Sequence, residues 1–491
     1  MKRTFVTNLI LVLFLNLLVK PFWVFGIDRT VQNVVGAERY GFYFSLFSFS
    51  LLLNIVLDVG ITNFNNRSIA REPSLLSQYL SDIIFLKLFL AILYALVCLS
   101  AGLFIGYDRS QFGMLIILIL NQFLASFILY LRSNISGLHL FRTDSMISVL
   151  DRTLASIFCG VLLWGHVTST PFRIEWFIWS QTAAYLITIL VTLIIVLHKA
   201  GYLRFKISTS RMVGLLKSSY PFALLILLMS FYYRIDSVMI ERLLDQGKEQ
   251  AGIYAQSFRI LDAAGMFAFL FAGLLLPIFS RMIKKEEPVG EMVQLSFTLI
   301  FIPAIILAVM AAFYNFEILD WLYNEHIEAS SRIFPLLMFG FIAVSCTYIF
   351  GTLLTANGNL RLLNLLALSA VFMNILLNLA LIPRYQAFGA AVSSLITQAY
   401  MAAAQVIISV IKFRLHINFT YLSLLSFYTI LIILTGWLCS KYTLNWYYGV
   451  MTYLAISMAI PFIIRLLKFR DMIRLLLPRF TPAGSSDEFI G

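Results

Sequence analysis

Long apolar runs separated by short polar segments make up nearly the whole chain. A membrane span needs about 20 mostly apolar residues, and the runs predict about 14 transmembrane helices. The predicted spans are 5–27, 40–63, 80–105, 112–134, 145–166, 174–197, 217–241, 252–280, 292–316, 333–356, 361–382, 388–411, 421–440 and 445–467. The predicted fold class is therefore an all-α polytopic membrane protein.

Composition supports this class. Of the 491 residues, 60% are hydrophobic and 12% are charged. A soluble globular chain is about 45–50% apolar and about 25% charged. Fourteen spans leave only short loops, which excludes a large soluble domain and with it an attached catalytic module. We therefore expect a protein that is not an enzyme.

The net charge of +12 is explained by membrane topology. Most Lys and Arg residues fall in segments that face the cytoplasm if the N-terminus is cytoplasmic, as the positive-inside rule requires. This distribution predicts that both termini are cytoplasmic. No basic face carries interleaved stacking aromatics outside the spans, so nucleic acid is not an expected partner.

A short motif occurs twice. Gly36–Tyr43 and Gly247–Tyr254 both read G-x-E-x-x-G-apolar-Tyr, and each copy follows an Ile-Asp pair, Ile27-Asp28 or Ile235-Asp236. The copies are six predicted spans apart, so the two halves share one orientation. Parallel repeats of this kind place the transport path between the halves.

The repeat predicts the domain organisation. Two six-helix bundles surround a central cavity, and two extra helices follow. The predicted parts are an N-terminal bundle (1–200), a basic cytoplasmic linker (201–216), a C-terminal bundle (217–412), helices 13 and 14 (413–467) and a basic amphipathic cytoplasmic tail (468–491).

Three motifs resemble the bacterial polysaccharide flippases of the multidrug/oligosaccharidyl-lipid/polysaccharide exporter superfamily. They are Val35-Gly36 with Tyr40-Gly41-Phe42-Tyr43; Tyr232–Asp236 with Gly252-Ile253-Tyr254-Ala255; and Asn374–Pro383 with Gly389-Ala390-Ala391. One departure is Tyr385-Gln386-Ala387, where the family often has a glycine.

The resemblance implies that the chain flips an undecaprenyl-diphosphate-linked oligosaccharide across the bacterial inner membrane by alternating access. Cell-surface polysaccharide assembly would be the purpose, and a polysaccharide polymerase and glycosyltransferases are the expected protein partners. Two alternatives remain. One is a cation-coupled multidrug exporter of the same superfamily, and the other is a membrane-embedded polysaccharide polymerase or ligase.

Charges inside the spans are the candidate site residues, because an ionisable side chain at the bilayer centre costs at least about 2.5–3.5 kcal/mol. Five are basic and suit a diphosphate moving through a hydrated cavity: Lys20, Lys87, Arg152, Arg234 and Arg259. Asp236 and Asp262 are candidates for Na⁺ or H⁺ coupling. Arg259 and Asp262, at i and i+3, are also placed to neutralise each other.

Other chemistry is missing from the sequence. There is no G-x-x-x-x-G-K-[ST] loop for ATP, and the five histidines lack metal-ligand spacing. The four cysteines lie in apolar runs without a C-x-x-C pair. We expect no cofactor and no bound metal apart from a coupling ion.

Overall fold

The computed structural model describes residues 15–16, 18–165, 167–201, 209–416, 418–443 and 445–467. Residues 5–14 and 17 of the first predicted span, residues 202–208 of the predicted linker and the tail 468–491 lie outside the described residues.

Helices form nearly all of the described chain. In order they are η1 (Phe22–Asp28), α2 (Arg29–Val35), α3 (Ala37–Leu52), η2 (Asn54–Leu57), α4 (Ile61–Arg71), η3 (Pro73–Leu75), α5 (Leu76–Ile105), α6 (Arg109–Gly137), α7 (Phe141–Trp164), α8 (Ile174–Ala200), α9 (Thr209–Leu243), α10 (Gly247–Lys284), α11 (Gly290–Phe313), α12 (Asn315–Leu322), α13 (Ile327–Ala356), α14 (Leu360–Lys412), α15 (Phe419–Tyr442) and α16 (Trp446–Ile463). The element η1 is a π-helix, and η2 and η3 are 3₁₀-helices.

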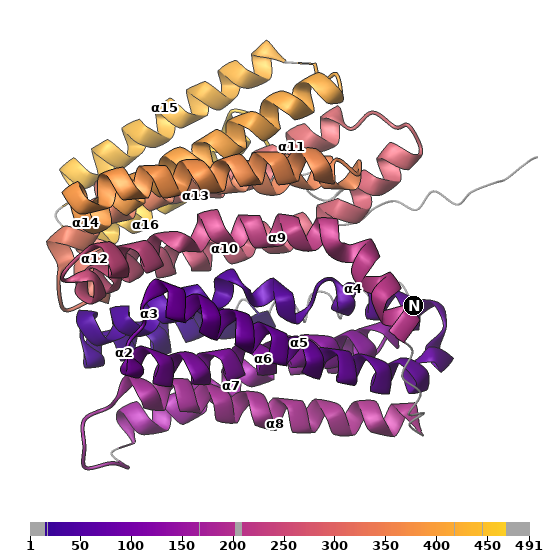
Figure 1. Ribbon diagram of the computed structural model, residues 1–491. Coiled ribbons are helices and arrows are strands. Elements are labelled where there is room, and N and C mark those ends of the chain that lie inside the picture. The colour runs from indigo at the N-terminus through magenta and orange to yellow at the C-terminus, as the bar shows by residue number, and fades with distance from the viewer. Residues whose placement is uncertain are drawn as a thin grey trace, which may run out of the picture.

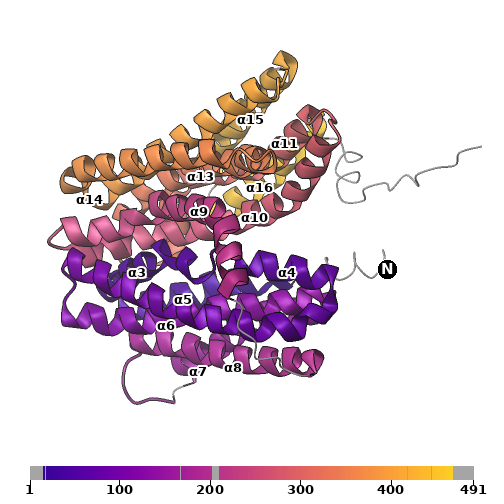
Figure 2. The ribbon, with the colours of Figure 1, turned by 45° about the vertical axis from the view of Figure 1, so that its right-hand side comes forward.

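Two layers of helices lie one on the other (Figures 1 and 2). Elements η1 to α8 form one layer, which we call the first half, and α9 to α16 form the second half. Helix α3 packs on α9 and α10 at the junction between them. Helices α15 and α16 pack on each other and on α11.

Eleven described helices are long and apolar enough to cross a membrane, or twelve if the pair Ala37–Leu52 and Asn54–Arg71, bent by 52°, is one span. Large apolar side chains cover their outward faces, such as Phe104 on α5 and Ile463 on α16. The chain is a multi-pass membrane protein, and the predicted all-α fold class is confirmed. The prediction of about 14 spans is approximate, since 11 or 12 candidate spans lie in the described part of the chain.

Helix α14 contains two predicted spans, 361–382 and 388–411. Its backbone leaves the helical region at Gln386, with φ 53° and ψ −138°. The Ser369 and Tyr400 hydroxyls lie 2.7 Å apart, so the two parts of α14 fold back on each other. Gly389 permits this turn, because an added Cβ would overlap the Leu381 carbonyl group.

Local signals set the helix ends. Gly106 ends α5 in the left-handed conformation. Asp108 then caps α6: its carboxylate accepts a bond from the Gln111 backbone N–H at 2.8 Å, and the Gln111 side chain accepts one from the Asp108 N–H at 2.9 Å. This reciprocal pair fixes the connection at which α5 and α6 reverse direction.

The two copies of the repeated motif meet at the junction between the halves. A Cβ on Gly41 of α3 would overlap the Lys248 carbonyl oxygen, and one on Gly252 of α10 would overlap the Ala37 carbonyl oxygen. The Gln32 side chain donates to the Gly252 carbonyl oxygen at 3.0 Å. Glycines that allow close backbone contact are typical of membrane helix interfaces, and here they join the halves.

Candidate functional site

A buried ion pair joins the two halves where η1 and α3 of the first half contact α10 of the second. Arg259 Nε of α10 lies 2.9 Å from Asp28 Oδ2 of η1. It also donates to the Tyr40 hydroxyl at 2.9 Å, and that hydroxyl donates to Asp28 Oδ1 at 2.9 Å. The Asp28 and Arg259 side chains are 3% and 14% exposed, so both charges are largely removed from solvent and depend on each other.

The charges continue into the second half. Arg259 Nη1 lies 3.8 Å from Asp262 Oδ2, and Arg234 Nη2 donates to both Asp262 oxygens, at 3.0 and 3.2 Å. The four groups alternate in sign in the order Asp28, Arg259, Asp262, Arg234. Both expected roles of Arg259 and Asp262 therefore remain consistent with their positions: they neutralise each other in part, and they lie beside Arg234.

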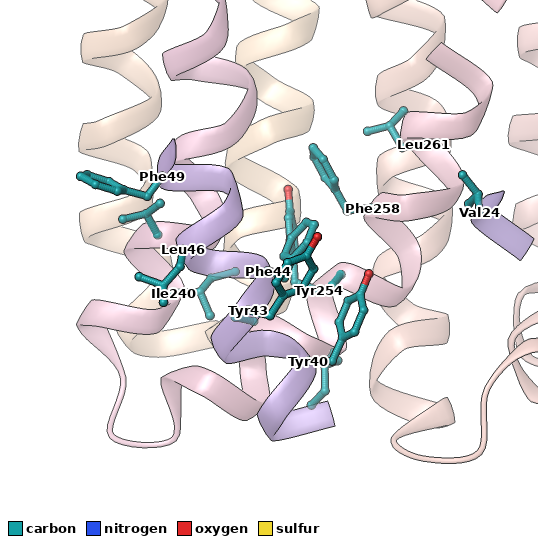
Figure 3. Packing of buried hydrophobic residues seen from close by; sticks show 14 of the residues in the cluster. Val24, Tyr40, Tyr43, Phe44, Leu46, Phe49, Ile240, Tyr254, Phe258 and Leu261 are labelled. Atoms are coloured by element: carbon teal, nitrogen blue, oxygen red, sulfur yellow. The ribbon is translucent and has the colours of Figure 1, made fainter. Parts of the chain in front are cut away.

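Aromatic rings surround these guanidinium groups. Arg259 lies 5.1 Å from the centroid of Phe44, and Arg234 lies 5.4 Å from that of Phe258. Figure 3 shows Tyr40 and Phe44 of α3 close to Tyr254 and Phe258 of α10. Cation–π contacts stabilise a desolvated arginine without neutralising it. Both arginines therefore have aromatic contacts in addition to their carboxylate partners.

Arg152 of α7 forms a second basic position, in the first half. It lies 5.1 Å from the Trp23 ring centroid, with Asp151 3.8 Å away and the Gln181 amide oxygen at 3.4 Å. Its side chain is 30% exposed. Lys20, just before η1, is partly buried.

Lys87 occupies a different environment. Its ammonium group donates to Asp58 Oδ1 at 2.6 Å, to the Leu57 carbonyl oxygen at 2.9 Å and to the Ser126 hydroxyl at 3.0 Å. The side chain is 1% exposed, and these three acceptors match its three N–H donors. Lys87 thus links α5 to η2 and α6 by hydrogen bonds within the first half, and it does not contact Arg234 or Arg259.

Asp236 of α9 is fully buried and is held by neutral donors. Asn378 donates to Oδ1 at 2.7 Å, Asn374 donates to the same oxygen at 3.1 Å, and the Tyr254 hydroxyl donates to Oδ2 at 3.0 Å. The Asn378 side-chain oxygen has no hydrogen-bonding partner in the described part of the chain. Carboxylate and amide oxygens of this kind suit a small cation.

A set of contacts joins the two halves at the end that the sequence predicts to face outwards, and we call it the outer seal. Asn33 donates to the Leu322 carbonyl oxygen at 2.9 Å, and Arg29 donates to the carbonyl oxygens of Trp321 and Leu322. The Glu325 carboxylate accepts from the Ala37 N–H at 3.1 Å. These bonds connect α2 and α3 to the end of α12 and to the segment between α12 and α13.

A pocket of about 600 Å³ opens beside the outer seal, between α3, α6, α8 and α10. Arg39, Arg173 and Lys248 line it together with Glu38 and Glu175. It lies at the end of the molecule that is predicted to face outwards, and neither Arg234 nor Arg259 lines it. Among the described residues, no group of three His, Cys, Asp or Glu side chains could hold a metal ion.

Several of these residues were not assigned a role from the sequence. Asp28, Tyr40, Asn374 and Asn378 occur in the quoted motifs, but the motifs alone do not show that the side chains converge. The repeated Ile-Asp pair was the available signal, because both aspartates accept a bond from a tyrosine of the following span: Tyr40 for Asp28 and Tyr254 for Asp236.

Residues 7–283 match the family model described as "Polysaccharide biosynthesis protein", which is more than half of the chain. The chain belongs to this family. It is a polysaccharide flippase family of the superfamily that also contains multidrug exporters, as the motifs indicated.

One relative is the "Capsular polysaccharide biosynthesis protein CapF" of Staphylococcus aureus, 25% identical over 167 residues. The match covers 33% of this chain and 41% of that relative, so the chain is aligned with less than half of the relative's length.

Solved structures show the same fold at low identity. The structure of a "Lipid II flippase MurJ, inward closed conformation" has a TM-score of 0.68 at 14% identity. The match covers 95% of this chain and 100% of the MurJ chain. A multidrug resistance MATE family transporter in an inward-facing conformation has a TM-score of 0.61 at 14% identity, covering 82% and 94%.

Proposed function

We propose that this protein flips an undecaprenyl-diphosphate-linked oligosaccharide from the inner to the outer leaflet of the bacterial inner membrane. The family membership and the flippase-like fold support this proposal at the level of polysaccharide biosynthesis. The buried ion pair between Arg259 and Asp28 carries the finer assignment, because it joins the two halves where a substrate would pass.

A diphosphate competes with Asp28 for the guanidinium group. Phosphate oxygens accept bidentate, charge-assisted bonds from arginine, as a carboxylate does. When the diphosphate binds Arg259, the bond that holds the halves together at this point is lost. Substrate binding would thereby favour separation of the halves on one side of the membrane, which is the requirement of alternating access.

The proposed path for the diphosphate includes Lys20, Arg152, Arg259 and Arg234. These residues lie on both halves, and three of them also contact aromatic rings. We leave Lys87 out of the path, because its three donors are satisfied inside the first half. Sugar units would contact the surrounding aromatic and polar side chains.

Asp236 is the proposed site of ion coupling. A buried carboxylate held only by neutral donors gains most from a proton or a sodium ion, since no basic group among its hydrogen-bonding partners neutralises it. Asp262 is less suited to this role, because Arg234 already pairs with it.

Both termini are proposed to be cytoplasmic, from the distribution of Lys and Arg. The substrate would come from membrane glycosyltransferases on that side and would be used by a polysaccharide polymerase on the other. Neither partner enzyme is needed for the flipping step itself, so the step can be tested with purified protein.

The test is flipping in liposomes that carry the lipid-linked oligosaccharide in one leaflet, with and without a pH or Na⁺ gradient. Arg234→Ala, Lys20→Ala and Arg259→Ala should slow the movement at least about tenfold, a loss of about 1.4 kcal/mol in transition-state binding. Arg332→Ala is the control, because it removes an exposed ion pair with Glu328.

Normal flipping by all three variants would contradict the assigned path. The MATE-like fold favours a second function, cation-coupled export of small molecules. Gradient-driven efflux of small organic cations, without movement of several lipid-linked glycans, would establish that function instead.

A further inference from the structure

A row of buried polar side chains runs along the second part of α14. Ser394, Gln398, Gln405 and Ser409 are each at most 4% exposed. At 100° per residue these positions fall within about 60° of one another around the helix. They therefore lie along one side of the helix over about 22 Å at 1.5 Å per residue, with the buried Met401 and Ala402 between Gln398 and Gln405.

Helix α13 provides the opposing wall. A Cβ added to Gly351 would lie 2.8 Å from the Gln405 amide oxygen, so these two positions face each other directly. Thr347 lies one turn before Gly351 on the same face of α13 and is also buried. We call these six residues the polar seam: Thr347, Gly351, Ser394, Gln398, Gln405 and Ser409.

The side chains of the polar seam are poorly satisfied by protein. In the described part of the chain no hydrogen-bonding partner exists for Thr347 Oγ1, Gln398 Nε2, Gln405 Oε1 or Ser409 Oγ. Within a lipid bilayer such groups are costly unless water or an ion completes their bonds. Three of these groups lie on one side of α14 and the fourth lies on α13, so water or an ion between the two helices would complete their bonds.

The polar seam connects two functional regions. At one end, the Ser394 hydroxyl lies within reach of the Asp236 carboxylate. At the other end, Ser409 is three residues from Lys412, where α14 ends on the face predicted to be cytoplasmic. Asp236 itself lies in the outer part of α9, seven residues before Leu243. The polar seam therefore leads from Asp236 towards the opposite end of the second half.

We propose that the polar seam is the route by which the coupling cation, a proton or a sodium ion, passes between Asp236 and the cytoplasm. This inference rests on the proposed ion coupling at Asp236. It separates the cation's route, within the second half, from the substrate's path between the halves. Cation release can then follow a fixed channel while the halves move.

The first experiment measures hydration and needs no substrate. In a variant without the native cysteines, Ser409→Cys and Gln405→Cys are treated with a small cationic methanethiosulfonate from the cytoplasmic side. The reagent attacks thiolates, which form in water, so we expect labelling at least about tenfold faster than at dry positions. The controls are Leu353→Cys, fully buried among apolar side chains, and Ile407→Cys, on the lipid-facing side of α14.

Labelling of Ser409→Cys and Gln405→Cys no faster than of both controls would overturn the proposal, because the polar seam would be dry. This result is independent of flipping. It therefore distinguishes failure of the route from failure of the proposed function.

The second experiment blocks the route from α13. Gly351→Val places methyl groups against Gln405, whereas Gly340→Val, on the same helix, meets no atom within 4 Å of the added Cβ. We expect Gly351→Val to lower the acceleration of flipping by an imposed gradient to less than about a third, and Gly340→Val to retain it. Separate Na⁺ gradients at fixed pH and pH gradients without Na⁺ identify the cation.

Full gradient acceleration in Gly351→Val, with the labelling pattern intact, would also overturn the proposal: the polar seam would be wet without carrying the ion. Asp236→Asn serves as the reference. If that substitution leaves gradient dependence unchanged, the coupling assignment fails, whatever the labelling shows.

Discussion

At the scale of single residues, Arg259 has two roles that oppose each other: one holds the halves together and the other requires that contact to break. It stabilises the contact between the halves through Asp28, and it is proposed to bind the substrate. A buried pair of this kind is weak evidence for net stability, but removing one partner leaves an uncompensated charge. The two roles can therefore be separated by comparing single and double variants.

Arg259→Ala should lower the free energy of unfolding by about 3–5 kcal/mol, since Asp28 is left buried without its cation. Asp28→Asn combined with Arg259→Ala should recover a large part of this stability but no flipping. Thermal unfolding in detergent and flipping in liposomes measure the two effects. Equal stability of the wild type and Arg259→Ala would show that the pair does not hold the halves together.

Lys87 illustrates what the sequence could and could not indicate at this scale. A lysine within an apolar run predicts either a hydrated cavity or a buried hydrogen-bonding partner, and either one offsets the free-energy cost of the charge in the membrane. The choice depends on Asp58, 29 residues away, and Ser126, 39 residues away, which meet Lys87 only after three helices have packed. Spacing along one helix carries no such information.

At the scale of elements, the turn inside α14 departs from the pattern of the family at Gln386. The backbone there has a positive φ, a region that costs a non-glycine residue about 1–3 kcal/mol. The side chain is exposed, so it contributes little packing to offset this cost.

Gln386→Gly should therefore stabilise the protein. The strain that glycine relieves exceeds the roughly 0.5–1 kcal/mol that its extra freedom in the unfolded chain costs, so we expect a net gain of about 1 kcal/mol. Thermal unfolding measures this gain. The control is Arg384→Gly, which replaces a residue in the helical part just before the turn. A loss of stability in Gln386→Gly would mean that the turn is unstrained.

The crossing of α3 and α10 depends on two glycines that the sequence did single out. Gly252→Ala should force the helices apart, because the new Cβ overlaps the Ala37 carbonyl group. Overpacking of this kind costs about 1–3 kcal/mol. Gly273→Ala, on the same helix, meets nothing within 4 Å and should be neutral or stabilising.

Proteolysis from the outer side, together with thermal unfolding, checks the effect of these two variants. If the outer seal depends on the close approach of α3 and α10, Gly252→Ala should be cut faster at the segment between α12 and α13. Indistinguishable behaviour of the two variants would show that the crossing tolerates a side chain.

At the scale of the whole molecule, repeated patterns were predictable and convergent contacts were not. The period of the apolar runs predicted the all-α fold, and the duplicated glycine motif indicated two equivalent halves. The Arg259 to Asp28 pair joins residues far apart in the sequence, and the outer seal uses the carbonyl oxygens of Trp321 and Leu322. Because every residue has a backbone carbonyl oxygen, a sequence pattern cannot indicate which of them accept these bonds.

The outer seal provides the last test, because alternating access requires it to open. Asn33 and Leu322 lie on opposite halves and are joined by a bond of 2.9 Å from the Asn33 side chain to the Leu322 carbonyl oxygen. Asn33→Cys with Leu322→Cys, in a variant without native cysteines, should be linked readily by a short bifunctional thiol reagent. Flipping should then fall at least about tenfold and return when the link is reduced.

A matched pair within one half controls for the reagent. His326→Cys with Glu249→Cys joins the residue before α13 to α10, and the native His326 and Glu249 side chains lie 3.3 Å apart within the same half. Linking this pair should leave flipping intact, since the contact need not break when the halves separate. Persistent flipping by the linked Asn33 and Leu322 variant would mean that substrate leaves without opening the outer seal, and the path would then have to run along the lipid-facing side of the molecule.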